Sequence, residues 1–319
     1  MNKFKFDIIV PIYNIENELE TCLESLRNQT YNNFTVLMID DGSTDSSAII
    51  AQKYANEDQR FNYFFKENGG LSDARNFGLD KATHDYVLFI DGDDFIEVGT
   101  LEFLNKKLDE YNLDVLEFNG WYFENGHKTA LFNSHYIDSG IVKKGSDFFV
   151  DNLKAGCMYS AVWLKVVNRN WLQETGLIFE KGLLHEDELW TPQLYLNAER
   201  VMYVDTPLYN YVQRQGSIMH QVNRDKNVQD AREIYYKLEN VYSNYNLTNK
   251  QRKVLMDYLA RKMLGSFYEP SQVEVGVKDI NFVFKHAKRI RTLGQAAIYR
   301  CFPIALPRIK NAVKKIIRY

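Results

Sequence analysis

Short apolar runs alternate with longer amphipathic stretches over the first 120 residues of the chain. The short runs are rich in β-branched and aromatic residues and predict strands, whereas the longer stretches predict helices. The predicted strands are 6–12, 34–39, 61–65, 86–90 and 114–118, and the predicted helices are about 18–29, 44–54, 72–82 and 100–111. Strands that alternate with helices predict βαβ units and a mostly parallel, Rossmann-like central sheet flanked by helices.

Beyond residue 120 the pattern changes twice. Between about 121 and 215 helix-like and strand-like stretches are mixed, and from about 223 the chain is mainly helical. The stretches in the mixed region are 145–153, 161–167, 186–197 and 201–204. We therefore expect an α/β domain over 1–220, followed by a helical region over 221–319.

Polar clusters follow four of the predicted strands at the point where each strand ends. They are Tyr13-Asn14, Asp40-Asp41, 66–70 and Asp91-Gly92-Asp93-Asp94. Ligands of parallel α/β sheets bind outside the carboxyl ends of the strands, so we expect these clusters to meet at one edge of the sheet.

The last of these clusters places three carboxylates directly behind a strand that reads as buried. Carboxylates in a crevice repel one another and lose hydration unless a positive charge lies among them. A divalent cation such as Mg²⁺ or Mn²⁺ suits them, because it takes oxygen ligands and often shares them with phosphate. The alternative is a solvated turn before a helix that begins near Val98, because Asp-Gly is a common turn and Asp a good helix cap.

Two further motifs suit a nucleotide. In Asp40-Asp41-Gly42-Ser43 an aspartate could accept hydrogen bonds from a nucleobase or a ribose, although the same residues suit a helix N-cap. Gly69-Gly70 precede a predicted helix whose Arg75 could pair with Asp40 or with phosphate. The chain lacks G-x-G-x-x-G and G-x-x-x-x-G-K-[ST], which argues against a dinucleotide-binding fold and a P-loop kinase.

In their order along the chain, these motifs resemble those of a family-two glycosyltransferase of GT-A fold, over about residues 5–220. They are Ile9-Val10-Pro11-Ile12-Tyr13-Asn14, Asp40-Asp41-Gly42-Ser43, Asn68-Gly69-Gly70 with Ala74-Arg75-Asn76, and Asp91-Gly92-Asp93-Asp94. The resemblance implies transfer of a sugar, with inversion, from a nucleotide donor that is usually linked to uridine diphosphate (UDP). It also implies a divalent metal, Mn²⁺ or Mg²⁺.

The resemblance assigns roles to individual residues. Pro11 and Tyr13 would line the base pocket, Asp40 would contact the uracil, and Arg75 would brace that end of the pocket. The full set that it places at the nucleotide sugar before residue 100 is Pro11, Tyr13, Asp40, Asn68, Arg75, Asp91 and Gly92.

The D-x-D pair of the resemblance is Asp91 and Asp93. Asp93 would be the direct metal ligand, Asp91 a ribose or water-mediated contact and second metal candidate, and Asp94 a helix-start or supporting carboxylate. Residues 209–220 resemble a loop that closes over the donor in many bacterial members. The residues of this loop with implied roles are Arg214 and Ser217 at the diphosphate and His220 at the metal.

An inverting transfer needs a general base opposite the leaving diphosphate, so the base must come from outside the D-x-D loop. Residues 184–190 resemble the Glu-Asp motif of the family, which assigns the base to Asp187, with Glu186 as second choice. The alternative is an acid-rich helix N-terminus, which the helix dipole favours. Trp190 could stack on an acceptor sugar or belong to the core.

Charge is unevenly distributed along the 319 residues. The chain has 39 Lys and Arg against 42 Asp and Glu, a formal net charge of −3. Ten of the basic residues and none of the acidic ones lie in 281–319, among many apolar residues. A basic amphipathic segment predicts binding to an anionic membrane surface; a solvated helix face or a partner-docking helix are the alternatives. No RNA-binding motif occurs, so we expect no nucleic-acid partner.

The three cysteines lie far apart and lack metal-ligand spacing, and no stretch approaches the length of a membrane span. We therefore expect a cytoplasmic enzyme, peripheral on the inner face of the membrane, with a glycan or lipid-linked saccharide as acceptor. Two alternatives stay open. A nucleotidyltransferase predicts a Gly-rich basic loop after the first strand, and a non-catalytic partner subunit predicts degraded acidic motifs.

Overall fold

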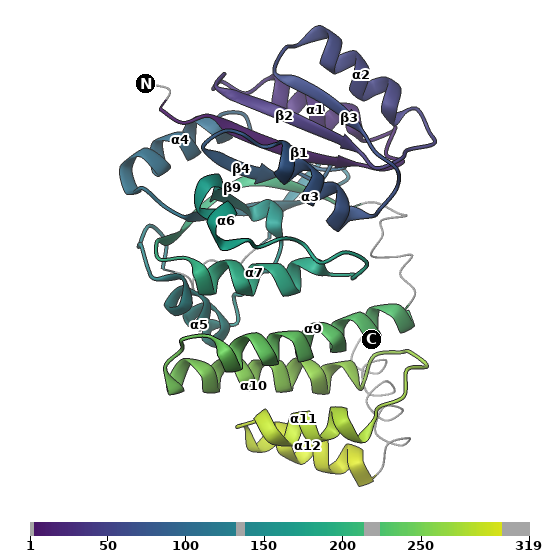
Figure 1. Ribbon diagram of the computed structural model, residues 1–319, viewed down its shortest axis with the longest axis vertical. Helices are drawn as coiled ribbons and strands as arrows, with labels where there is room; N and C mark the ends of the chain where they lie inside the picture. The colour runs from purple at the N-terminus through teal and green to yellow at the C-terminus, as the bar shows by residue number, and fades with distance from the viewer. Residues whose placement is uncertain (1–2, 132–137, 214–223, 302–319) are drawn as a thin grey trace. The chain divides into compact units, whose positions relative to one another are not determined.

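The computed structural model describes residues 3–131, 138–213 and 224–301 (Figure 1). Two compact units divide the chain, Met1–Ser217 and Ile218–Tyr319. The first unit is built on one sheet, and the described part of the second consists of helices.

The described residues of the first unit form a nine-stranded sheet in the order β3-β2-β1-β4-β8-β6-β9-β5, with β7 paired to β6. The strands are β1 Phe6–Ile12, β2 Phe34–Asp40, β3 Phe61–Phe65, β4 Tyr86–Phe89, β5 Phe95–Ile96, β6 Val115–Glu124, β7 His127–Ala130, β8 Lys165–Asn168 and β9 Val201–Val212. Pairing is parallel from β3 to β4 and between β6 and β9. It is antiparallel where β8 separates β4 from β6, and at β5 and β7.

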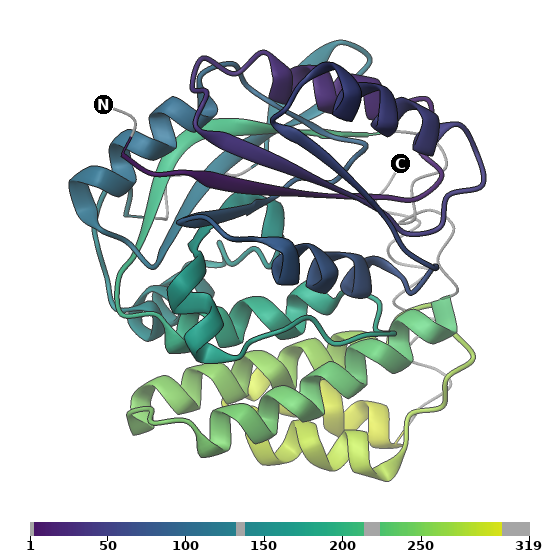
Figure 2. The same cartoon turned by 45° about the horizontal axis from the view of Figure 1, so that its top comes forward.

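Helices cover both faces of the sheet. They are α1 Leu19–Arg27, α2 Ser47–Glu57, α3 Leu71–Lys81, α4 Thr100–Tyr111, α5 Gly145–Ala155, α6 Arg169–Thr175 and α7 Glu186–Asn197, with a short 3₁₀ helix, η2, at Val162–Leu164. Figure 2 shows α1 and α2 on one side of the strands β1 to β4 and α3 on the other. Every residue of β1 and β4 is buried, as their mainly apolar sequences predict for strands covered on both faces.

Several elements differ from their predicted extents, and the strand predicted at 201–204 continues as β9 to Val212. The strand predicted at 114–118 continues as β6 to Glu124, because Asn125 and Gly126, with φ of 50° and 80°, form a tight hairpin turn to β7. The strand predicted at 161–167 begins as η2 and becomes β8 only at Lys165. The Asn-Gly pair was the available signal for the hairpin.

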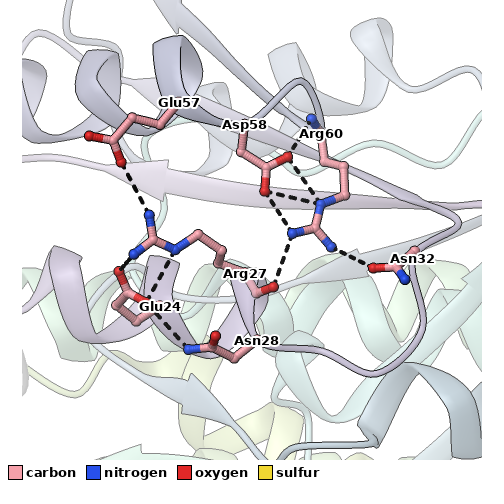
Figure 3. Close-up of polar contacts among 7 residues, drawn as sticks. All are labelled: Glu24, Arg27, Asn28, Asn32, Glu57, Asp58 and Arg60. Carbon is pink, nitrogen blue, oxygen red and sulfur yellow. Dashed lines mark hydrogen bonds and ion pairs between the residues drawn. The ribbon is translucent and has the colours of Figure 1, made fainter.

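Polar contacts fasten the end of α1 to the end of α2 and to the loop before β2 (Figure 3). Arg27 pairs with Glu24 on its own helix, and its Nη1 lies 3.2 Å from Oε2 of Glu57. Arg60 binds Asp58 through two nitrogens and donates from Nη2 to the Arg27 carbonyl oxygen, 3.0 Å away. These contacts lie far from the polar edge of the sheet and serve the packing of α1 and α2.

The second unit contains α9 Arg224–Asn244, α10 Asn249–Ser266, α11 Val277–His286 and α12 Ile290–Cys301. A capping box of Thr248 and Gln251 starts α10. The buried Arg232 of α9 donates to Ser266 of α10 and pairs with Asp279 of α11, so one side chain joins three helices. Within the described residues, no helix is both long and apolar enough to cross a membrane.

Candidate active site

The polar clusters meet at one edge of the sheet. Ile12 of β1 is in register with Asp40 of β2, and Asp40 with Phe65 of β3. β4 pairs with the other side of β1 and leads into the segment Asp91–Asp94. The convergence that the strand order predicts is therefore present in the structure.

Asp40 is fully buried and already bonded within the protein. Its Oδ2 accepts a hydrogen bond from the Tyr63 hydroxyl at 2.7 Å, and its Oδ1 accepts one from the Ser43 N–H at 2.8 Å. Two aromatic side chains lie at the same strand ends and are largely exposed, Tyr13 by 51% and Phe65 by 61%. An aspartate between exposed rings is a suitable setting for a nucleobase.

Asp41 holds the glycine loop in place. Its carboxylate accepts hydrogen bonds from the N–H groups of Gly69, at 2.9 Å, and Gly70, at 2.7 Å, and it pairs with Lys66. The Asn68 side chain donates to the Asp41 carbonyl oxygen at 2.9 Å. Sequence reasoning singled out the loop but missed that Asp41 organises it, because this depends on backbone N–H groups that only the fold directs.

The three aspartates of the D-x-D segment have different surroundings. Asp94 is 2% exposed, and it accepts hydrogen bonds from the Tyr209 hydroxyl, at 2.7 Å, and from the Val212 N–H, at 2.8 Å. Burial, together with Asp93 and Asp91, raises the pKa of Asp94 well above its usual range. Asp93 stays half-buried. Asp94 therefore supports the loop from beneath, which agrees with its expected role.

Gly92 lets this segment approach β1. A Cβ at residue 92 would lie 2.5 Å from Cδ1 of Ile15 and 2.9 Å from the carbonyl oxygen of Pro11. The second of these atoms is backbone and cannot move aside cheaply. The glycine between the two aspartates is thus required by close packing against the end of β1, where Pro11 is buried.

Arg75 connects the D-x-D segment to α7. Its Nη2 lies 2.7 Å from Oδ1 of Asp91, and its Nη1 pairs with Glu186 at the start of α7. Arg75 is 3% exposed, and its guanidinium also lies 5.6 Å from the centre of the Phe179 ring. Asp40, one of the two partners considered for Arg75 from the sequence, is bonded to Tyr63 instead.

Asp187 lies in the first turn of α7, next to the Glu186 that pairs with Arg75. Burial, and then the neighbouring Glu186 and Glu188, raise the pKa of Asp187 to about 6, while Arg75 and His185 oppose the shift. His185, with φ of 60°, ends the preceding loop and starts α7. A carboxylate with a raised pKa is a better proton acceptor, as a general base requires.

Comparison with known proteins identifies the family. The profile of Glycosyl transferase family 2 matches residues 7–162. The uncharacterized glycosyltransferase YibD of Escherichia coli K12 is 34% identical over 230 residues, which cover 70% of this chain and 67% of YibD. The chain belongs to glycosyltransferase family 2. The resemblance drawn from the motifs is confirmed.

Other relatives show how far the family-2 likeness extends. The glycosyltransferase GlyA of Streptococcus pneumoniae is 36% identical over 222 residues, but these cover 67% of this chain and only 31% of GlyA, so the chain spans about a third of that relative. The structure of Staphylococcus aureus TarS 1–349 in complex with UDP-GlcNAc superposes with a TM-score of 0.68 at 25% identity, over 92% of this chain and 81% of TarS 1–349. The predicted GT-A fold class is confirmed.

Family-2 enzymes generally use a divalent metal, and the D-x-D segment has suitable chemistry for one. Asp91 is bonded to Arg75 and Asp94 to Tyr209, and Asp93, between them in the sequence, is half-buried. No group of three His, Cys or acidic side chains within 3–131, 138–213 and 224–301 could enclose a metal. Magnesium is commonly bound by one or two carboxylates and by phosphate oxygens of the substrate, so one carboxylate fits.

Three of the residues expected at this family-2 site, Arg214, Ser217 and His220, lie outside the described residues. β9 leads towards them and ends at Val212, beside Asp94. Trp190 lies in the core: it is 1% exposed and stacks on Phe179 with ring centres 4.6 Å apart. The possibility that it stacks on an acceptor was wrong.

Replacing Arg75 should destabilise the first unit strongly. Arg75→Met leaves the carboxylates of Asp91 and Glu186 without their cation, and we expect the free energy of unfolding to fall by about 3–5 kcal/mol. The free energy of unfolding of the double variant Arg75→Met/Glu186→Gln should fall by less, because this variant also removes one of the two unpaired carboxylates. Urea unfolding measures both.

The half-exposed Arg27, which also pairs with two carboxylates, supplies the control. Arg27→Met should cost much less than Arg75→Met, because solvent screens the ion pairs of Arg27. Equal losses for Arg75→Met and Arg27→Met would contradict the buried bridge.

The raised pKa of Asp187 predicts a stability effect that needs no substrate. A carboxyl group whose pKa is raised in the folded state stabilises the protonated fold and is penalised as the pH rises through about 6. Asp187→Asn should therefore be more stable than the wild type by roughly 1–3 kcal/mol at pH 8, and the gain should largely vanish at pH 4. The exposed Asp80, replaced by Asn, is the control and should show no such gain. A pH-independent effect of Asp187→Asn would refute the assignment.

Proposed function

We propose that this chain transfers a sugar from a UDP-sugar to a hydroxyl of a glycan or lipid-linked saccharide, with inversion, in the synthesis of a bacterial surface polysaccharide. The observation that carries the proposal is the Arg75 bridge. It joins the D-x-D segment, where the donor diphosphate would bind, to the helix that carries Asp187. The bridge therefore couples the leaving-group side of the reaction to the base side.

UDP is the nucleotide that the site supports. The structural relative TarS was crystallised with UDP-GlcNAc and with UDP. Asp40 would accept from the uracil N–H beside Tyr13 and Pro11, and Tyr63 would keep the carboxylate oriented. Asp41 would act indirectly, by holding the loop that contains Asn68.

Asp187 would act as the base of a single displacement. As the acceptor oxygen bonds to the anomeric carbon, the bond from that carbon to the diphosphate oxygen breaks, and the hydroxyl proton passes to Asp187. Glu186 is less suited to this task because Arg75 already pairs with it. The raised pKa of Asp187, about 6, increases its basicity and still leaves most of it ionised at neutral pH.

A divalent metal, Mn²⁺ or Mg²⁺, would supply charge stabilisation at the leaving diphosphate. Asp93 would bind it, Asp91 would orient the ribose or a bound water, and Gly92 would allow the close approach of the loop. We assign Arg214, Ser217 and His220 to the remaining diphosphate and metal contacts from the motif resemblance.

The rival functions have less support. The loop after the first strand carries neither the glycines nor the basic residue that a nucleotidyltransferase predicts, and the family match covers that strand. A non-catalytic subunit predicts degraded motifs, whereas Asp91, Asp93 and Asp187 are all present.

A donor screen tests the proposal. The chain should hydrolyse one member of a panel of UDP-sugars in the presence of Mn²⁺. Asp187→Asn should lower that rate at least about 100-fold while UDP binding is retained. Asp93→Ala should weaken Mn²⁺-dependent UDP binding by roughly tenfold or more, measured by calorimetry. Glu188→Gln is the matched control and should keep most activity. Undiminished turnover in Asp187→Asn would refute the assignment of Asp187 as the base.

We also propose that the basic segment 281–319 binds the inner face of the cell membrane. The full chain should co-sediment with vesicles containing phosphatidylglycerol but not with vesicles of phosphatidylcholine alone, and 0.5 M NaCl should release it. A chain that ends at Cys301 loses half of the ten basic residues and should bind less. Equal binding of both chains would argue for a protein partner of the tail.

A further inference from the structure

Four aromatic side chains form a row beside the D-x-D segment, here called the aromatic platform: Trp163, Tyr209, Tyr211 and Tyr122. The Trp163 ring lies nearly parallel to Tyr209, with centres 4.4 Å apart and an angle of 20°, and to Tyr211, at 5.5 Å and 17°. Tyr211 in turn contacts Tyr122 at 5.9 Å. Tyr209 and Tyr211 are two residues apart on β9 and so point to the same face of the sheet.

The inner end of the platform is bonded to the D-x-D segment. The Tyr209 hydroxyl donates to Oδ2 of Asp94 at 2.7 Å and accepts from the Asp91 N–H at 3.2 Å. Tyr209 is fully buried, so its ring is held rigidly. Trp163 is therefore separated from the D-x-D segment by a single, fixed tyrosine.

The chain just before Trp163 is bonded to the helix that carries Asp187. The Thr191 hydroxyl on α7 donates to the Ser160 carbonyl oxygen at 2.6 Å. Thr191 follows Asp187 by four residues, so both lie on one face of α7. Trp163 thus stacks on the tyrosine that is bonded to the D-x-D segment, and the chain three residues before it is bonded to the helix that carries Asp187.

The buried Lys165 anchors the same stretch from below. Its Nζ donates to the carbonyl oxygens of Ala161, at 2.8 Å, and Tyr159, at 3.2 Å. Burial lowers the pKa of Lys165, and the nearby Glu117 and Asp187 oppose this shift, which agrees with its position behind the base. Three consecutive carbonyl groups, 159 to 161, are thus bonded to buried donors, and Trp163 follows on a fixed support.

Packing alone does not explain the exposure of this platform. Trp190 shows what a core tryptophan looks like here, at 1% exposure, whereas Trp163 and Tyr211 are only half-buried and Tyr122 is 36% exposed. The C–H groups on one face of a pyranose ring are apolar and pack well on an aromatic ring. In an in-line displacement the acceptor hydroxyl must lie between the base and the donor carbon, which is the region that Trp163 borders.

We propose that Trp163 is an acceptor-binding residue that stacks on the pyranose ring carrying the reactive hydroxyl, with Tyr211 and Tyr122 extending the surface to the next sugar. The inference rests on the proposed function and makes it more specific. It assigns the acceptor to the class of saccharides with a ring at the reactive end. An open-chain polyol phosphate has no such face and would be a poor substrate.

The test separates acceptor binding from donor chemistry in the full chain. The donor is the UDP-sugar found in the donor screen, used with Mn²⁺. For each variant we measure donor hydrolysis without acceptor and sugar transfer to each member of an acceptor panel. The panel is methyl glucopyranoside, methyl galactopyranoside, methyl N-acetylglucosaminide, cellobiose and ribitol 5-phosphate. Trp163→Ala should raise KM for the preferred glycoside about tenfold, whereas Trp163→Phe should raise it less. Acceptor-independent hydrolysis should stay within about twofold of wild type for both variants.

Trp171 on α6 is the matched control, because it is also half-buried and lies at the ends of the strands opposite to the D-x-D segment. Trp171→Ala should change neither measurement. The proposal would be overturned by an unchanged KM in Trp163→Ala. It would also be overturned if the wild type used ribitol 5-phosphate in preference to every glycoside, or if it hydrolysed the donor but transferred sugar to no glycoside. So would equal losses of hydrolysis in Trp163→Ala and Trp163→Phe, because a structural role would then suffice. A wild type that hydrolyses no UDP-sugar would instead refute the proposed function itself, and the inference with it.

Discussion

The buried guanidinium of Arg75 is the interaction on which the arrangement of this site depends. It draws together carboxylates that are 95 positions apart, Asp91 behind β4 and Glu186 at the start of α7. Without a cation between them, two carboxylates in this largely buried position would repel each other. Arginine suits the task because its planar fork offers separate N–H groups to each partner. The distance between the D-x-D segment and α7 is thereby set by one side chain.

A second constraint is the crowding of negative charge around this bridge. Each acid is accommodated in a different way: Asp91 by Arg75, Asp94 by the Tyr209 hydroxyl, and Asp41 by Lys66 and two N–H groups. Burial, and then the neighbouring Glu186 and Glu188, raise the pKa of Asp187, although Arg75 and His185 oppose the shift. The same crowding of negative charge that suits a divalent cation at Asp93 therefore also makes the Asp187 carboxylate more basic.

The aromatic residues connect these charged parts. Tyr209 belongs at once to the sheet, to the D-x-D segment through its hydroxyl, and to the aromatic platform through its ring. Phe179 plays a comparable part on the other side, where it stacks on Trp190 and lies under the Arg75 guanidinium. Rigid rings of this kind lose little conformational entropy on ordering, so they hold polar groups in place at low cost. Aromatic side chains thus surround the charged residues of the site.

Much of this could be predicted from local pattern. Apolar runs located β1 to β4, and their order brought Tyr13, Asp40, Gly69 and Asp91 to one edge, because parallel strands joined by helices leave their carboxyl ends together. The family followed from the same motifs. The pairing of distant side chains did not: the sequence suggested Asp40 or phosphate for Arg75, whereas its partners are Asp91 and Glu186. It also drew attention to Trp190 and not to Trp163. Which carboxylate meets a given arginine, and which tryptophan keeps an exposed face, depend on burial and on contacts between segments a hundred residues apart. Those are properties of the packed chain, because periodicity reports which face of an element is apolar but not what lies against it.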